Sequence, residues 1–281
     1  MFKKLMSAHI APLSPQPTSA KPSLKLKSPV RAILFDIYGT LFISKAGDIS
    51  LSKKETEISS ALNKLCEKYA VNQPVEDLMD RFYRTIEKTH ENLKKTGIDF
   101  PEVQIEHIWM DVANFDDINI AQNFAIEYEM IVNPVYPMPG LLDVLKTISN
   151  HPIYMGIISN AQFFTPHLFD LFCGAMPEHL GFHPDLIFYS FQHNHAKPSL
   201  YLFNKAIDRI KKIGLVPEEV LYVGNDMLND IYSAYSVGFQ TGLFAGDARS
   251  LRLRESNPNC NALTPDAVIT NLDQLVTLLN I

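Results

Sequence analysis

ILFDIYGTL at residues 33–41 is an apolar run that ends at Asp36 and turns at Gly39. A short apolar run bounded by turn residues is typical of a buried strand. In an open parallel sheet, ligands bind outside the carboxyl ends of the strands. A carboxylate at that place serves as a metal ligand, a nucleophile or a general base. The same residues are also compatible with an ordinary turn. The choice between a functional carboxylate and a simple turn therefore depends on the rest of the chain.

Length and charge limit the possible functions. The 281 residues are enough for one large α/β domain, or for a core with a smaller insertion. The formal net charge of -6 gives no case for nucleic-acid binding, which requires a concentrated basic surface. No apolar run is long and uninterrupted enough to cross a bilayer, and the N-terminus lacks the compact apolar core that is typical of a secretory signal. We therefore predict a soluble protein that acts on a small molecule, with neither nucleic acid nor membrane as partner.

The three cysteines bear on the cellular compartment. Cys66, Cys173 and Cys260 are far apart, and no Cys-x-x-Cys pair occurs. This pattern indicates neither a disulfide framework nor a zinc site. It predicts a reducing, cytoplasmic location.

The N-terminal segment differs in composition from the rest of the chain. Residues 1–28 contain many Ser, Pro and Lys, and the first acidic residue of the chain is Asp36. Such a segment buries too little surface to fold alone, so we predict a disordered basic tail. A transit peptide is the alternative, but such peptides favour Arg, and the first arginine here is Arg31.

Residues 44–136 show helical rather than strand patterning. Apolar residues recur at helical spacing in four stripes, which predict an insertion of about four helices. Trp109 falls in one of these stripes and is expected in the core of the insertion. A rigid Pro-rich segment, residues 134–140, then joins this insertion to the rest of the chain.

From residue 141 onward, predicted helices and strands alternate. Short apolar runs predict strands at residues 153–158, 186–189, 220–223, 241–244 and 268–269. Alternation of this kind implies an α/β fold, a parallel sheet covered by helices on both faces. We therefore expect the core to comprise residues 29–43 and 137–281.

Polar residues follow three further predicted strand ends or helix starts. Ser159 and Asn160 follow one strand, and Lys197 precedes Pro198 at a predicted helix start. Asp226 follows another strand, with Asn229 and Asp230 on the next helical turn. Each group has a simpler interpretation as a helix cap or a solvated charge. In a parallel sheet, however, all of them converge with Asp36 on one crevice.

The chemistry of this set indicates phosphate binding. Clustered carboxylates repel one another, and Mg²⁺ relieves that repulsion while also binding phosphate oxygens. Lys197 adds positive charge, and the Ser159 hydroxyl and Asn160 amide suit anionic oxygens.

These residues together resemble the motifs of the haloacid dehalogenase-like hydrolase superfamily. The four motifs occur in the family's order over residues from about 30 to 270, and a set of four is far more specific than any one. They are Asp36-Ile37-Tyr38-Gly39-Thr40, Ser159-Asn160, Lys197-Pro198 and Asp226-Met227-Leu228-Asn229-Asp230.

This resemblance implies a Rossmann-like core with an all-helical cap at residues 44–136, and a role for each motif. Asp36 would attack phosphorus to give an aspartyl-phosphate, with Ser159 and Lys197 as catalytic partners. Mg²⁺ would be held by Asp36, Asp226 and the backbone carbonyl of Tyr38. Asp230 and Asn229 would support that site. The phosphate group of a small-molecule substrate would be bound by Thr40, Ser159, Asn160 and Lys197.

Tyr38 departs from the phosphatase form of the first motif. Phosphatases of this superfamily usually carry a second Asp there as general acid and base, and a phenol with a pKa near 10 is a poor base at neutral pH. Asp-x-Tyr-Gly-Thr is similar to the 2-haloacid dehalogenases, in which Asp displaces halide from carbon without metal. Those enzymes lack an acidic residue equivalent to Asp226 and grip the substrate carboxylate with a cap Arg, for which Arg81 and Arg84 are loose candidates.

The sequence therefore predicts a Mg²⁺-dependent phosphatase and keeps two alternatives. The fourth motif favours phosphatase, because Asp226 beside Asp36 would repel a halocarboxylate unless a cation were present. The alternatives are a dehalogenase and a catalytically weak protein that binds a phosphorylated ligand or a partner. If a substitute proton donor is needed, His195 is its first candidate. Neither the natural substrate nor the oligomeric state follows from the sequence.

Overall fold

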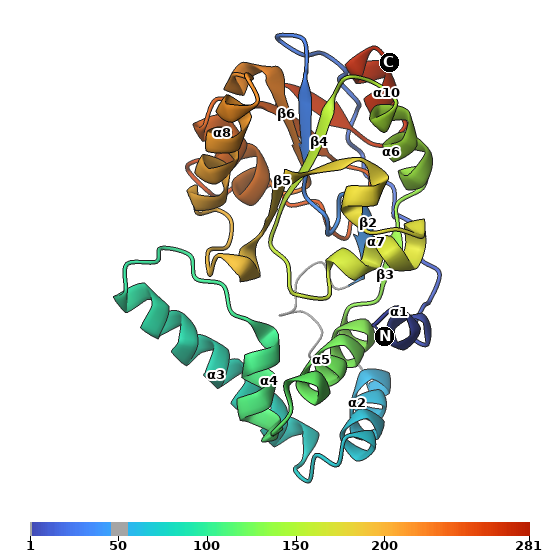
Figure 1. Cartoon of the computed structure of the whole chain (residues 1–281), viewed down its shortest axis with the longest axis vertical. Helices are drawn as coiled ribbons and strands as arrows, with labels where there is room; N and C mark the ends of the chain where they lie inside the picture. Colours follow the sequence, from blue (N-terminus) through green and yellow to red (C-terminus); the bar gives the residue numbers. More distant parts are fainter. Residues whose placement is uncertain (1, 46–55) are drawn as a thin grey trace.

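A computed structural model describes residues 2–45 and 56–281 (Figure 1). Its centre is a parallel sheet of six strands in the order β5-β4-β1-β6-β7-β8. This arrangement confirms the predicted α/β fold and puts the strand of the opening motif in the middle of the sheet. The strands are β1 (Ala32–Phe35), β4 (Tyr154–Ser159), β5 (Phe182–Tyr189), β6 (Val220–Gly224), β7 (Gln240–Phe244) and β8 (Ala267–Ile269).

Helices cover both faces of the sheet because β1 is apolar on both sides. Ile33 and Phe35 pack into one cluster with α6 (Leu141–Ser149), α7 (Pro166–Cys173) and α10 (Gln274–Leu279). Ala32 and Leu34 point the other way, into a cluster with α8 (Tyr201–Lys212) and α9 (Ser233–Ser236). All four β1 residues are buried, as expected of a central parallel strand.

One strand is longer than the sequence predicted. The prediction began this strand at Leu186, whereas β5 begins at Phe182 and includes Pro184. Proline is tolerated there because β5 is the edge strand of the sheet, and its pairing with β4 is irregular between Met155 and Ile157. Short helical turns complete the core at Pro177–Leu180, Ser190–Gln192, Pro217–Glu219 and Met227–Tyr232.

Four helices of the described residues form a bundle at the carboxyl edge of the sheet, where Figure 1 labels them α2 to α5. They lie between two antiparallel strands, β2 (Phe42–Ser44) and β3 (Val135–Pro137), and pack around the fully buried Trp109. We propose that residues 44–136 act as a cap on a core of residues 29–43 and 137–281. Residues 46–55 of this cap lie outside the described residues. The helices are α2 (Thr56–Lys68), α3 (Val75–Lys95), α4 (Ile105–Ala113) and α5 (Ile118–Val132).

The sequence predicted a disordered tail at residues 1–28, and the structure differs from this prediction over residues 2–28. Helix α1 (Phe2–Ser7) buries Met6 completely in the main apolar cluster, and Ser23 pairs with Val268 at the edge of the sheet. Composition showed that the segment cannot fold alone. It could not show that the core offers an apolar surface for Met6 and its neighbours to cover.

Two further observations concern the described residues. Within residues 2–45 and 56–281, no helix combines the length and apolarity needed to span a membrane. Cys66, Cys173 and Cys260 are free thiols.

Candidate active site

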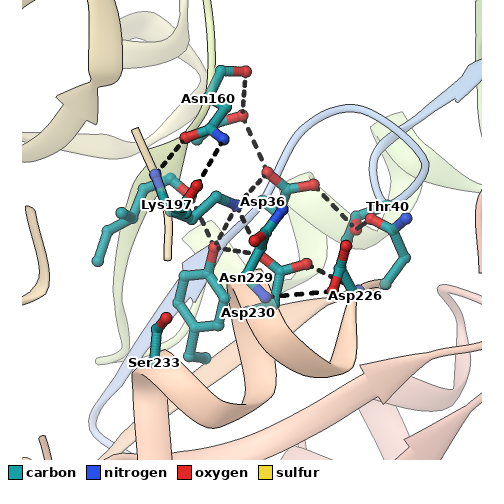
Figure 2. Close-up of polar contacts among 12 residues, drawn as sticks. Asp36, Thr40, Asn160, Lys197, Asp226, Asn229, Asp230 and Ser233 are labelled. Atoms are coloured by element: carbon teal, nitrogen blue, oxygen red, sulfur yellow. Dashed lines mark hydrogen bonds and ion pairs between the residues drawn. The ribbon is translucent and has the colours of Figure 1, made fainter. Parts of the chain in front are cut away.

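Asp36 lies directly after β1, at the carboxyl edge of the sheet, with 6% of its surface exposed. Its Oδ1 accepts hydrogen bonds from Ser159 Oγ at 3.0 Å and from Lys197 Nζ at 2.7 Å. Ser159 is the last residue of β4, which pairs with β1 in parallel. The structure thus brings the three predicted catalytic residues into contact, and Figure 2 shows Lys197 beside Asp36.

Lys197 links two buried carboxylates. Its Nζ lies 2.7 Å from Asp36 Oδ1 and 2.5 Å from Asp230 Oδ1, and it is 3.1 Å from the Tyr222 hydroxyl. Burial alone would lower the pKa of Lys197, but the carboxylates of Asp230 and Asp36 outweigh burial and raise it. The ammonium therefore stays charged and offsets the negative charge of both carboxylates.

Asp230 supports this network from the helical turn after β6. Its Oδ2 accepts the backbone N–H of Asp226 at 2.9 Å. Burial raises the pKa of Asp230 to about 6; the Lys197 ammonium opposes this rise, and the Asp36 carboxylate adds to it. Gly224 permits the close approach, because a Cβ at that position would overlap the Asp230 carboxyl group.

Asp226 has a partner that the sequence did not indicate. Its Oδ1 caps the following helical turn by accepting the N–H groups of Leu228 and Asn229, at 2.8 and 3.1 Å. Arg254 Nη2 lies 2.6 Å from Asp226 Oδ2, and Arg254 Nε lies within 3.2 Å of both carboxylate oxygens. A guanidinium therefore neutralises one of the predicted metal ligands. Arg254 lies 28 positions after Asp226, and no local pattern marks it.

Of the predicted phosphate-binding residues, Thr40 contacts the Asp36 carboxylate and Asn160 contacts the backbone of Lys197. Thr40 Oγ1 lies 3.4 Å from Asp36 Oδ2 and 3.1 Å from Asn225 Oδ1. Asn160 brackets the backbone of Lys197: its Oδ1 accepts the Lys197 N–H at 2.7 Å, and its Nδ2 donates to the Lys197 carbonyl at 3.3 Å. The Asn160 amide thus fixes the position of Lys197, a contact that the sequence analysis missed.

The Tyr38 hydroxyl pairs with a hydroxyl group of the core rather than with a carboxylate. The hydroxyl lies 2.9 Å from Thr165 Oγ1. Burial raises the pKa of Tyr38 far above its ordinary value, and the nearby Glu129 carboxyl adds to this rise. The phenol therefore stays neutral. The next residue, Gly39, has a φ of +82°, and a Cβ there would lie 2.6 Å from the Ser250 Cβ, so the turn requires glycine.

A cavity of about 360 Å³ opens above these residues, between the core and the cap. The core side contains all the predicted carboxylates, Lys197 and two arginines. The cap side contributes Glu102, Glu129 and Asn133, none of which the sequence analysis singled out. Glu129 lies on α5 and Glu102 in the loop before α4. A lone glutamate in either place is usually solvated, so no sequence signal marks these two. The lining residues are Asp36, Tyr38, Ser44, Glu102, Glu129, Asn133, Asn160, Ala161, Gln162, Phe164, Lys197, Asn225, Asp226, Asn229, Asp230, Arg252 and Arg254.

Three other residues that the sequence analysis considered do not line this cavity. The His195 ring stacks on Tyr201 at 3.9 Å, and its Nδ1 is 2.7 Å from the carbonyl oxygen of His193, so it is not placed as a substitute proton donor. Arg81 bonds to Gln73 and to a backbone carbonyl, and Arg84 forms an exposed pair with Asp80. Neither arginine is placed to grip a substrate carboxylate.

The donor atoms suit a hard cation. The described residues contain no cluster of three or more His, Cys, Asp or Glu side chains that could enclose a metal ion. Mg²⁺ does not need one, because it is usually held by one or two carboxylates together with waters and substrate phosphate. Asp36 and Asp226 line one cavity. The Arg254 guanidinium offsets part of their negative charge through its ion pair with Asp226. The oxygen set therefore fits Mg²⁺, provided that Arg254 moves aside.

Comparisons with known proteins bear on the family and on the fold. A family model described as haloacid dehalogenase-like hydrolase matches residues 30–238. No curated protein matches the chain at a significant level.

Several solved structures share the fold. A 2-haloacid dehalogenase from Pseudomonas syringae pv. Tomato DC3000 is 20% identical, with a TM-score of 0.57 over 89% of this chain and 98% of that one. A HAD phosphatase from Thermococcus onnurineus is 18% identical, with a TM-score of 0.53 over 89% and 98%. A putative HAD-hydrolase from Bacillus subtilis, bound to magnesium, is 19% identical, with a TM-score of 0.51 over 90% and 100%. At such identities the likeness shows the fold alone.

Proposed function

Because this chain belongs to the haloacid dehalogenase-like hydrolases, we propose that it is a Mg²⁺-dependent phosphatase acting on a small phosphorylated metabolite. The observation that carries this proposal is that Asp36 and Asp226, at the ends of the paired strands β1 and β6, line one cavity together with Lys197. A nucleophilic carboxylate, a second carboxylate and a buried ammonium are what phosphoryl transfer requires, because its catalysis depends mostly on positioning and charge stabilisation.

The roles of the core residues follow from their contacts. Asp36 attacks phosphorus and forms an aspartyl-phosphate, which water then hydrolyses. Ser159 and Lys197, which hold Asp36 Oδ1 at 3.0 and 2.7 Å, orient the carboxylate and meet the negative oxygens of the transferring group. Thr40 donates to the same group from the other side of Asp36.

The metal would be held by Asp36, Asp226 and the backbone carbonyl of Tyr38. When bound, Mg²⁺ supplies positive charge to the phosphate oxygens. Asp230 and Asn229 support Asp226: the Asp230 carboxylate accepts the Asp226 N–H, and the Asn229 N–H donates to the Asp226 carboxylate.

The cap side of the cavity also favours a phosphate ester over a halocarboxylate. Its described lining residues include two carboxyl groups, Glu102 and Glu129, and no lysine or arginine. A halocarboxylate needs a cation for its own carboxylate. A phosphate ester needs no cation on the cap side, because its alcohol leaving group is neutral.

A 2-haloacid dehalogenase is the second candidate, and the Arg254–Asp226 pair favours it. This guanidinium supplies positive charge beside Asp36 without a metal, which removes part of the repulsion that a halocarboxylate would meet. Halide release from 2-chloropropionate in the presence of EDTA would support this candidate.

We expect purified protein to hydrolyse p-nitrophenyl phosphate with Mg²⁺ and to lose this activity in excess EDTA. This ester has a good leaving group, so it tolerates a weak general acid. Phosphate release is measured in both conditions, and adding back Mg²⁺ controls for damage by the chelator. Activity that persists in EDTA, or no activity in either condition, would contradict a metal-dependent phosphatase.

Replacing Arg254 with glutamine is expected to strengthen metal binding. The Arg254 side chain is 40% exposed, so its ion pair contributes only about 1 kcal/mol, and its loss should tighten Mn²⁺ binding about fivefold. Binding is measured by electron paramagnetic resonance of free Mn²⁺. The matched control is Arg252→Gln, because the Arg252 guanidinium lines the same cavity but donates to the carbonyls of Arg249 and Leu251. Under the dehalogenase candidate, Arg254→Gln would instead abolish halide release.

The three free thiols agree with a reducing compartment, and we propose that the protein acts in the cytoplasm.

A further inference from the structure

The proposed reaction needs a proton donor that Tyr38 does not supply. A poor leaving group must receive a proton as its bond to phosphorus breaks, and water must lose one when it attacks the aspartyl-phosphate. The Tyr38 hydroxyl is engaged with Thr165 Oγ1 at 2.9 Å and cannot act as a base at neutral pH. Another group in the cavity therefore has to move protons.

Two carboxyl groups face the cavity from the cap, and Glu102 already has a structural role. Its Oε1 accepts the N–H of Val103 at 2.9 Å and Gln162 Nε2 at 3.1 Å, and its Oε2 accepts Ser190 Oγ at 2.7 Å. Gln162 and Ser190 belong to the core, so Glu102 joins the cap to the core. With both oxygens occupied, it has little capacity left for a substrate.

Glu129 differs from Glu102 in having a single hydrogen-bond partner among the described residues. Asn133 Nδ2 donates to Glu129 Oε1 at 2.9 Å, and Asn133 Oδ1 accepts from Ser44 Oγ at 2.8 Å. Ser44 ends β2, one of the two strands that join core and cap. Glu129 is therefore anchored at the base of the cap and lines the cavity, and its Oε2 accepts no hydrogen bond from the described side chains.

The position of Glu129 also relates it to the first motif. It lies close enough to Tyr38 to influence the pKa of that residue, and Tyr38 is two residues after Asp36. Burial raises the pKa of the Glu129 carboxyl itself, and the hydrogen bond from Asn133 only partly offsets this. The carboxyl thus holds its proton to a higher pH than an exposed glutamate does, as a general acid should.

We propose that Glu129 is the general acid and base of the reaction, a role that rests on the proposed phosphatase function. In the first step, an Asp36 oxygen forms a bond to phosphorus while the bond from phosphorus to the ester oxygen breaks, and that oxygen takes the Glu129 proton. In the second step, the Glu129 carboxylate takes a proton from water as the water oxygen attacks phosphorus. The acyl phosphate bond then breaks, and Asp36 and protonated Glu129 are restored. The sum is phosphate ester plus water giving alcohol plus phosphate.

The test compares two esters of similar shape that differ in leaving group. We expect Glu129→Gln to lower kcat/KM for phenyl phosphate about 100-fold or more, and for p-nitrophenyl phosphate by less than about tenfold, because only the poorer leaving group needs the proton. Glu129→Asp keeps a carboxyl group and should recover part of the loss on phenyl phosphate. Thermal unfolding of each variant shows whether it is folded.

Glu102→Gln is the matched control, because it removes a second cavity carboxyl group. The amide can keep the contacts to Val103, Gln162 and Ser190, so any loss should be by the same factor on both esters. Equal losses on both esters in Glu129→Gln would overturn the acid role while leaving the phosphatase function standing. A wild-type protein with no Asp36-dependent turnover would overturn both.

Discussion

Asp36→Asn is expected to abolish phosphate-ester hydrolysis, with a loss in kcat on the order of 10⁴-fold or more. The amide keeps the size of the side chain, and its oxygen can still accept from Ser159 and Lys197. It lacks the negative charge that attacks phosphorus, so no aspartyl-phosphate forms. The measurement is turnover of p-nitrophenyl phosphate with Mg²⁺, together with acid quenching after a ³²P-labelled substrate. Wild-type protein should carry label, and the variant none.

The control for this variant is Asp143→Asn, which neutralises an exposed carboxylate on α6. It should retain wild-type turnover. Substantial turnover by Asp36→Asn would mean that another group is the nucleophile, and the proposed function would fall. Asp36-dependent turnover in the wild type would exclude the third possibility considered from the sequence, a protein that binds a phosphorylated ligand without hydrolysing it.

Lys197→Met is expected to reduce the free energy of unfolding by about 3–5 kcal/mol at neutral pH and to remove activity. The Lys197 side chain is 3% exposed, and its ammonium contacts Asp36 and Asp230 at 2.7 and 2.5 Å. Methionine fills similar space but leaves both buried carboxylates without a cation. Urea denaturation of the two proteins measures the difference. An unchanged midpoint would show that the buried network adds no net stability.

The loss in Lys197→Met should shrink as the pH falls. Burial already raises the pKa of Asp230 to about 6 with Lys197 present, above the ordinary value of about 3.9 in the unfolded chain. A carboxyl group with a raised folded pKa favours the folded state at low pH, and this contribution is lost as the pH rises through the folded pKa. In Lys197→Met the pKa of Asp230 should rise further, because the ammonium that opposed the rise is gone. Asp230 then takes up a proton at a higher pH, and this protonation removes its repulsion with Asp36. The double variant Lys197→Met/Asp230→Asn should regain part of the stability at neutral pH.

Much of the fold and part of the site could be predicted from the sequence because their signals are local. Each core strand is a short apolar run that ends in a polar or turn residue, and parallel pairing brings those ends to one edge. Asp36 and Ser159 follow this rule, whereas Lys197 and Asp230 lie in the segments after β5 and β6. The structure brings all four into one hydrogen-bonded network.

Other residues at the cavity could not be found in this way, because burial and pairing depend on segments far apart in the chain. Glu129 lies on a helix where glutamate is usually solvated. It faces the cavity only because the cap folds over the sheet. Arg254 reaches Asp226 from a loop 28 residues later, and no spacing rule connects them.

The N-terminal segment is another case in which the local sequence was not enough to predict the structure. Its composition predicted disorder, yet Met6 is fully buried against the core. The sequence by itself determined which strands form the parallel sheet, how they alternate with helices and which polar groups end them, since these depend on neighbouring residues. Only the tertiary structure decided which distant side chains share the cavity, and with what partners, because the free energy of each such contact depends on surfaces that exist only after folding.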